Sequence, residues 1–216
     1  MKDVMREMLY SVKQAVLVSV VLMLICGLLY PCAMTGLSAL LFPDQANGSL
    51  LIVEGKAVGA ANVGQEFTQD CYLWGRPSAY HYNTYVEGAD GKRYYQDGTE
   101  FAGLASGSSN YGPSNPALAE RVEADMTAFL QKNPTVAREE IPTDLLTASG
   151  SGLDPHISPA AADVQVARIA AARGIAEQEV RKVIAACSED KLFRVFGEPT
   201  VNVLKVNLML DGLLKQ

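Results

Sequence analysis

The sequence gathers side chains of the kind used in hydrolysis within one short glycine-containing segment. Ser149, Ser151, Asp154 and His156 lie within eight residues of one another, inside the stretch from Thr147 to Pro159. A serine nucleophile, a histidine base and an aspartate that orients the base are the three parts of a Ser-His-Asp triad. The spacing therefore raises the hypothesis of a hydrolase.

Two features of this segment favour a structural loop over a catalytic site. The residues of a triad usually come from distant segments of the chain, whereas these are almost adjacent. The nucleophile motif G-x-S-x-G also fails, because Thr147 or Ala148 stands where its first glycine should be. We expect a glycine-punctuated loop that precedes and caps a helix, and that faces the protein's own elements or a partner.

Individual roles follow for the residues of this loop. Gly150 and Gly152 should give the backbone freedom, and Pro155 should fix one φ angle. Asp154 and His156 should make local hydrogen bonds and transfer no protons.

No other segment of the sequence predicts a directly bound cofactor. Residues 150–152 lack the third glycine of a dinucleotide fingerprint, and residues 88–92 have too few residues between glycines for a P-loop. The two histidines, His81 and His156, are far apart and have no nearby cysteine cluster, which argues against a zinc site.

The composition points to a membrane protein. The chain has 216 residues with 18 Lys and Arg against 24 Asp and Glu, so its net charge of -6 gives no support to a nucleic-acid partner. Only 19% of residues are charged, against roughly 25% in ordinary soluble domains. The apolar excess is concentrated, since residues 14–43 carry no charge.

This uncharged stretch predicts one transmembrane helix over residues 14–36, since about 20 apolar residues cross a bilayer. The alternative is a cleaved signal peptide, whose apolar run is shorter, at about 7–15 residues. Pro31 marks a point where the helix could kink or end. Small residues within the span could allow close packing against helices of a partner. They are Ser19, Gly27, Ala33 and Gly36.

The flanking charges predict the orientation. Lys2, Arg6 and Lys13 precede the span, while Asp44 and Glu54 are the first charges after it. By the positive-inside rule, the tail of residues 1–13 stays in the cytoplasm. The sequence thus predicts a single-pass protein of the cell inner membrane, with a linker over residues 37–49 and an extracytoplasmic domain over residues 50–216.

The exterior part reads as a mixture of strands and helices. A hairpin is expected at residues 50–58, and a tyrosine-rich hairpin or loop excursion of unassigned role at residues 80–101. Three helices are expected, from Asn115 to Asn133, from Ser158 to Gly174, and along the apolar stripe from Val180 to Cys187. Alternating apolar residues between 204 and 210 predict a half-buried strand. The pattern lacks a βαβα rhythm, so the predicted fold class is α+β.

The four cysteines divide by position. Cys26 and Cys32 fall in or near the span and should act as small apolar residues. Cys71 and Cys187 would lie in an oxidising compartment, where a disulfide is one possibility that their spacing does not decide.

Taken together, motifs along nearly the whole chain resemble the C subunit of the Kdp-type potassium-transporting P-type ATPases, the KdpC family. Each motif is weak alone, but their order and spacing are specific. One departure is Ser108, which stands where the family has a glycine. The motifs are Gln45 to Leu50, Gly64 to Phe67, Tyr72 to Ser78, Ser106 to Asn110, Gly112 to Asn115, Thr147 to Pro159 with Gln165, Arg168 and Arg173, Gly197 to Pro199, Val201 to Leu204, and Asn207 to Asp211.

The resemblance implies a non-catalytic accessory subunit of a potassium uptake complex. Its partners would be a channel-like potassium-binding subunit, an ATP-hydrolysing subunit and the lipid bilayer. The chain itself has no Asp-Lys-Thr-Gly-Thr phosphorylation motif and no Thr-Val-Gly-Tyr-Gly filter. The motifs make these residues candidates for a partner-facing or structural loop: Arg76, Asn110, Ser149, Gly150, Ser151, Gly152, Asp154 and His156.

The family is described as a catalytic chaperone that raises the ATP affinity of the hydrolysing subunit. With the predicted topology only the short N-terminal tail lies in the cytoplasm, where ATP is, so an effect on ATP would pass through the complex. Two other classes remain open from the residues alone: a membrane-anchored extracytoplasmic hydrolase and an anchored ligand-binding domain.

Overall fold

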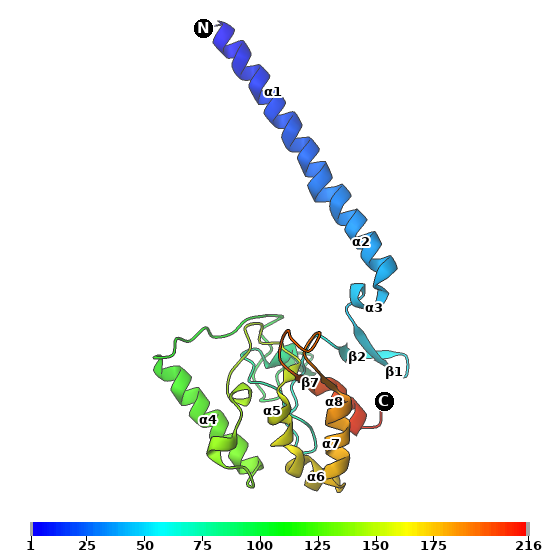
Figure 1. The fold of residues 1–216 in the computed structure, drawn as a ribbon. Coiled ribbons are helices and arrows are strands. Elements are labelled where there is room, and N and C mark those ends of the chain that lie inside the picture. Colours follow the sequence, from blue (N-terminus) through cyan, green and yellow to red (C-terminus); the bar gives the residue numbers. More distant parts are fainter. Residues whose placement is uncertain (1, 215–216) are drawn as a thin grey trace. The chain divides into compact units, whose positions relative to one another are not determined.

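The protein is described by a computed structural model over residues 2–214, and it divides into two compact units, Met1–Ser49 and Leu50–Gln216. The first unit is almost entirely helical (Figure 1). It consists of α1 (Lys2–Leu24), a π-helical turn (Ile25–Leu29), α2 (Tyr30–Leu41) and the short α3 (Pro43–Ala46). The stretch Asp3–Leu41 is long and apolar enough to cross a membrane, in agreement with the single predicted span.

Helical backbone extends beyond the predicted span at both ends, and Pro31 does not end it. Proline lacks the N–H that would bond to the carbonyl of residue 27. The π-helical turn lies immediately before it, and there the N–H of Tyr30 donates to the carbonyl of Ile25. Such a local change of helical pitch lets the chain accommodate a proline without breaking.

The second unit begins with the predicted hairpin. Strands β1 (Leu50–Val53) and β2 (Lys56–Ala60) pair antiparallel around Glu54 and Gly55. Both turn residues have positive φ, as type I′ hairpin turns require.

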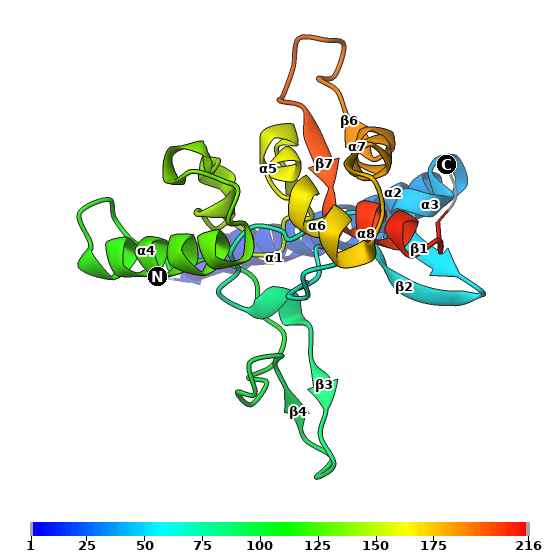
Figure 2. The same ribbon diagram turned by 90° about the horizontal axis from the view of Figure 1, so that it is seen from below.

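The tyrosine-rich excursion is also a hairpin, as expected. A 3₁₀ turn (His81–Asn83) leads into β3 (Val86–Glu87), which pairs antiparallel with β4 (Arg93–Tyr94). Figure 2 shows this hairpin projecting away from the helices of the unit.

A three-stranded antiparallel sheet and five helices complete the unit. The sheet has the order β5 (His156–Ile157), β7 (Thr200–Asn202), β6 (Ser188–Glu189). The helices are α4 (Pro116–Lys132), α5 (Pro159–Asp163), α6 (Val166–Arg173), α7 (Glu177–Ala186) and α8 (Val203–Leu210), with 3₁₀ turns at Arg138–Glu140 and Thr143–Leu145. Small sheets with segregated helices confirm the α+β class.

Most predicted helix boundaries are confirmed by their caps. The Asn115 side chain accepts a hydrogen bond from the N–H of Ala117, and Ser158 accepts one from Ala161. Gly174 ends α6 in the left-handed conformation. The predicted helix from 158 to 174 is, however, split into α5 and α6, since the N–H of Gln165 bonds to the carbonyl of residue 162 in a tighter turn.

The predicted strand over residues 204–210 is wrong, because this segment is helix α8. The side chain of Asn202 caps the helix by accepting from the N–H of Lys205. The alternation was misleading because α8 buries almost its whole circumference, and a helix buried on most sides loses the 3.6-residue period. The actual strand, β7, lies immediately before it. Buried residues of α8 are Val203, Leu204, Val206, Asn207 and Leu208.

The core of this unit joins α5 to α8 with the three-stranded sheet. Val166, Ile169, Val180 and Val201 are fully buried in it, and Phe129 of α4 packs at its edge. The predicted stripe of the third helix therefore faces the core.

Candidate functional site

The candidate site is positioned by an irregular segment, residues 70–78, that buried amide side chains hold in an extended form. The side chain of Asn207 accepts from the N–H of Leu73 at 2.8 Å and donates to its carbonyl at 2.9 Å. Gln165 does the same for Trp74, at 2.9 and 3.2 Å. These two amides satisfy the backbone as a neighbouring strand would.

Arg168 holds the beginning of the same segment. Its guanidinium donates to the carbonyls of Asp70 and Tyr72 and to the side chain of Asn133, and it lies 3.9 Å from the ring centre of Trp74. Burial lowers the pKa of Arg168 to about 10, because desolvation disfavours the charged form. The contacts with carbonyls and the aromatic face compensate for that cost.

The held segment places Arg76 against the glycine-containing loop. Arg76 donates to the carbonyl of Thr147 at 3.1 Å and forms an ion pair with Asp154 at 3.3 Å. The other carboxylate oxygen of Asp154 accepts from the backbone N–H of His156 at 3.0 Å. The structure thus brings together three of the residues selected from the sequence.

Ser78 of the same segment and two further segments bind the backbone of this loop. The hydroxyl of Ser78 donates to the carbonyl of Gly152 at 2.6 Å. The N–H of Gly107 donates to the carbonyl of Ser151 at 2.7 Å, and the N–H of Gly64 donates to the carbonyl of Leu153 at 2.9 Å. Residues 149–156 therefore link several segments of the second unit through hydrogen bonds.

The two glycines of the loop differ. Gly152 has φ +66°, and a Cβ there would lie 2.3 Å from the carbonyl oxygen of Gly107. Gly150 has no positive φ, and a Cβ there would meet nothing within 4 Å. Of the two predicted glycine requirements, the structure supports only the one at Gly152.

The serine hydroxyls serve the loop's own backbone. The N–H of Gly152 donates to Ser149 Oγ at 2.9 Å, and the N–H of Leu153 donates to Ser151 Oγ at 3.1 Å. The ring of His156 lies 3.4 Å from Asp154 Oδ1 on one side and from Asn202 Nδ2 on the other. Over residues 2–214 no hydrogen bond joins either hydroxyl to this ring, so the nucleophile and base of a triad are not in contact.

Asn110 is separate from these contacts, and it lines a cavity of about 620 Å³ beside α4. Arg121 and Asp125 form an ion pair there, and His81 Nδ1 lies 2.6 Å from a carboxylate oxygen of Glu66. Burial raises the pKa of Asp125 because it disfavours the carboxylate.

A smaller cavity of about 280 Å³ adjoins the first, sharing Glu66 and Asp125 and also lined by Arg76. The sequence reasoning did not select Glu66, Arg121 or Asp125. Two signals were available: Glu66 lies in the motif from Gly64 to Phe67, and Arg121 and Asp125 carry opposite charges four residues apart on an expected helix.

The described residues hold no group of three side chains arranged to bind a metal ion. All four cysteines carry free thiols, so Cys71 and Cys187 are unpaired here. Burial raises the pKa of Cys187 to about 11. In the first unit, the small residues Ser19, Gly27 and Gly36 are exposed along the helix.

Comparisons with known proteins point in one direction. A family model described as KdpC, the c chain of K⁺-transporting ATPase, matches residues 12–212. Proteins named potassium-transporting ATPase KdpC subunit are similar over most of their length. One from Clostridium kluyveri is 52% identical, covering 92% of this chain and 91% of its own, and one from Clostridioides difficile is 49% identical, covering 94% and 98%. One from Rhodopseudomonas palustris strain BisB5 is 46% identical, covering 97% and 100%.

Proposed function

Since the chain belongs to the KdpC family, the c chain of potassium-transporting ATPases, we propose that it is the single-span accessory subunit that assembles and stabilises a high-affinity potassium uptake complex. The observation that carries this proposal is the extent of the match, which covers both the apolar helix and the exterior unit. The helix would provide an anchor, and the compact second unit would provide the surface for contacts with other subunits.

The proposed partners are a channel-like potassium-binding subunit and an ATP-hydrolysing subunit, within the inner membrane. Ion selection and ATP hydrolysis would reside in those partners. The arrangement of Ser149, Ser151 and His156 supports this division, because the two hydroxyls serve backbone N–H groups and do not contact the imidazole. The loop that suggested a hydrolase is thus better explained as a structural loop that links segments of the second unit.

The proposed topology places the N-terminus in the cytoplasm and the second unit outside it. Lys2, Arg6 and Lys13 support this orientation, because positive charge flanks the cytoplasmic end of a span. Any increase in ATP affinity would then act by coupling through the complex, from an exterior domain to a cytoplasmic site.

The assembly proposal is tested by purifying the full-length chain in mild detergent. We expect two membrane subunits to co-purify with it and potassium-stimulated ATP hydrolysis to be recovered in the purified complex. A chain that purifies alone from cells producing all subunits would overturn the proposal.

A second experiment tests the orientation. Alkaline phosphatase fused after Gln216 should be active, because the enzyme folds only after export. An inactive fusion, together with a fluorescent reporter that folds in the cytoplasm and glows at the same position, would reverse the topology and reopen direct contact with ATP.

A further test addresses the packing of the span. Replacing residues 14–36 with polyleucine should weaken co-purification while leaving export intact, because small residues such as Gly27 and Gly36 let helices approach closely. Unchanged co-purification would mean that the exterior unit alone holds the complex.

A further inference from the structure

The loop between β6 and β7 exposes large apolar side chains that no element of the second unit covers. Phe193 is 80% exposed and Val195 is 70% exposed, and Leu192 and Phe196 are exposed by similar fractions. We call residues 191–196 the apolar loop. Figure 2 shows it projecting beyond the ends of α5 and α7. A cluster of large apolar residues on such a projection marks a surface made to contact something else.

The apolar loop is an ordered structure. The backbones of Leu192 and Phe196 exchange two hydrogen bonds, at 2.8 and 3.0 Å, and the N–H of Arg194 donates to the carbonyl of Lys191 at 2.9 Å. These bonds close a tight turn that fixes the direction of the side chains. An ordered tip can contact a partner with little further loss of conformational entropy.

The tip also carries backbone strain. Phe193 and Arg194 have φ values of +53° and +62°, a region that residues other than glycine rarely adopt. Such a residue is strained, and it persists where the surroundings or a function require it. The strained conformation holds an aromatic and a basic side chain at the most exposed point of the turn, where neither adds to the core.

The chemistry of the apolar loop suits the boundary of a lipid bilayer. Two phenylalanines, a leucine and a valine can enter the acyl boundary, while Lys191 and Arg194 can remain among phosphate headgroups. Lys191 pairs with Glu198 at 2.9 Å, whereas Arg194 makes no ion pair within residues 2–214. An unpaired arginine beside exposed phenylalanines is complementary to an anionic headgroup over an apolar layer.

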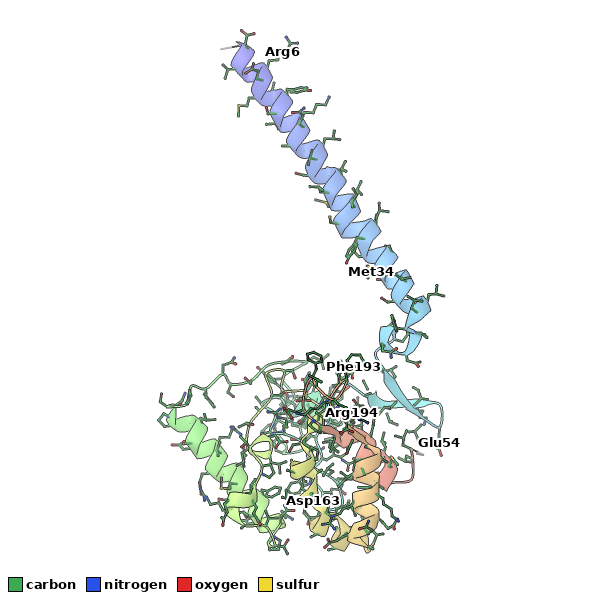
Figure 3. The ribbon with its side chains drawn as sticks, viewed as in Figure 1. Arg6, Met34, Glu54, Asp163, Phe193 and Arg194 are labelled. Carbon is green, nitrogen blue, oxygen red and sulfur yellow. The ribbon has the colours of Figure 1, made fainter. Side chains whose placement is uncertain are left out.

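The second unit is joined to the proposed transmembrane helix by a short connection. Only residues 42–49 separate the end of α2 from β1, a length of at most roughly 30 Å even when fully extended. Figure 3 shows Phe193 at the periphery of the second unit. A connection this short raises the effective concentration of a membrane surface for the exposed loops of that unit.

We propose that the apolar loop is a second membrane contact, in which Phe193 and its apolar neighbours insert into the outer face of the bilayer while Lys191 and Arg194 bind lipid phosphates. The inference depends on the proposed span. It does not depend on which subunits the chain joins. A loop held in the membrane would fix the orientation of the exterior unit with respect to the bilayer, which a single connection cannot do.

The test uses the full-length chain reconstituted into vesicles of phosphatidylcholine and phosphatidylglycerol, with and without brominated acyl chains that quench tryptophan on contact. Phe193→Trp places a reporter at the tip. Ile175→Trp is the matched control, since Ile175 is an exposed apolar residue in the turn between α6 and α7. The emission of Trp74, common to both variants, is subtracted with the parent protein.

We expect blue-shifted emission from Phe193→Trp and a loss of intensity in brominated vesicles, with neither effect for Ile175→Trp. No quenching of Phe193→Trp would overturn the proposal, and so would equal quenching of both variants, which indicates unspecific adsorption. A shift seen only after addition of the other subunits would overturn it in favour of a protein contact. Co-purification with those subunits is measured separately, so failure of the loop contact and failure of the accessory function give different results.

Discussion

Two loops of the second unit, residues 149–156 and the apolar loop of residues 191–196, differ in where their polar groups and side chains find partners. In the first, a carboxylate and backbone carbonyls bond to segments around residues 64, 76–78 and 107, and the serine hydroxyls accept hydrogen bonds from the loop's own backbone. In the second, the backbone bonds to itself and the large side chains contact water. The first loop completes the fold, whereas the second has properties that the fold alone does not explain.

The two loops also place their unusual backbone conformations on different residues. In the first loop the positive φ falls on Gly152, which has no Cβ and adopts it without strain. In the second it falls on Phe193 and Arg194, which adopt it at a cost. Strain on bulky exposed residues indicates selection for contact outside the fold, while glycine at a crowded position indicates selection for packing within it.

The largest effect should come from adding a side chain at the crowded position of the first loop. Gly152→Val should destabilise the full-length protein by about 4 kcal/mol or more, since the new Cβ meets the carbonyl of Gly107 and the φ angle is unfavourable for a β-branched residue. The matched control, Gly150→Val, should change stability by only about 0.5 kcal/mol. Thermal unfolding in mild detergent measures both, and equal losses would mean that the loop is not packed as described.

The next largest effect should come from removing the ion pair between Arg76 and Asp154, which holds this loop against the segment of residues 70–78. Arg76→Met should cost about 1–3 kcal/mol, because it leaves Asp154 and the carbonyl of Thr147 without their partner in a partly buried place. The control is Arg181→Met, which removes an arginine with two carboxylate partners, Asp163 and Glu177, at a more exposed site. That change should cost about 0–1 kcal/mol. The same unfolding measurement applies, and a larger loss for the control would contradict the comparison.

A smaller effect is expected from the hydroxyls and the imidazole of the first loop. Ser151→Ala should cost about 1 kcal/mol, since it leaves the N–H of Leu153 without its acceptor. Ser149→Ala should cost less, since the N–H of Gly152 also donates to the backbone carbonyl of Ser149 at 3.2 Å. These variants and His156→Gln should retain most of the potassium-stimulated ATP hydrolysis of the reconstituted complex. An intact complex whose activity falls about a thousandfold would instead identify a catalytic group.

The smallest effect should come from relieving strain in the second loop, and its sign should be opposite. Phe193→Gly should raise the free energy of unfolding by up to about 1 kcal/mol in detergent, because glycine adopts positive φ freely and the lost side chain is exposed. Phe196→Gly, in the same turn without a positive φ, should lower it by about 0.5–1 kcal/mol. Destabilisation by both changes would mean that the phenylalanines contribute to the fold.

Several features could be predicted from the sequence because their causes are local. A single apolar helix follows from the charge-free stretch, and the ends of α4 and α6 follow from Asn115 and Gly174. Caps and turns involve residues a few positions apart, so their signals are present in any short window. The order of the motifs was sufficient to identify the family.

Other features were decided only by tertiary structure, because their partners are far apart in the chain. The amide of Asn207 holds Leu73 across 134 positions, and Arg76 reaches Asp154 across 78. The same distance explains why Gly152 is constrained and Gly150 is not, since the obstructing carbonyl belongs to Gly107. Burial on nearly all sides made α8 a helix despite an alternating pattern, and burial depends on which elements surround a segment, which local spacing does not record.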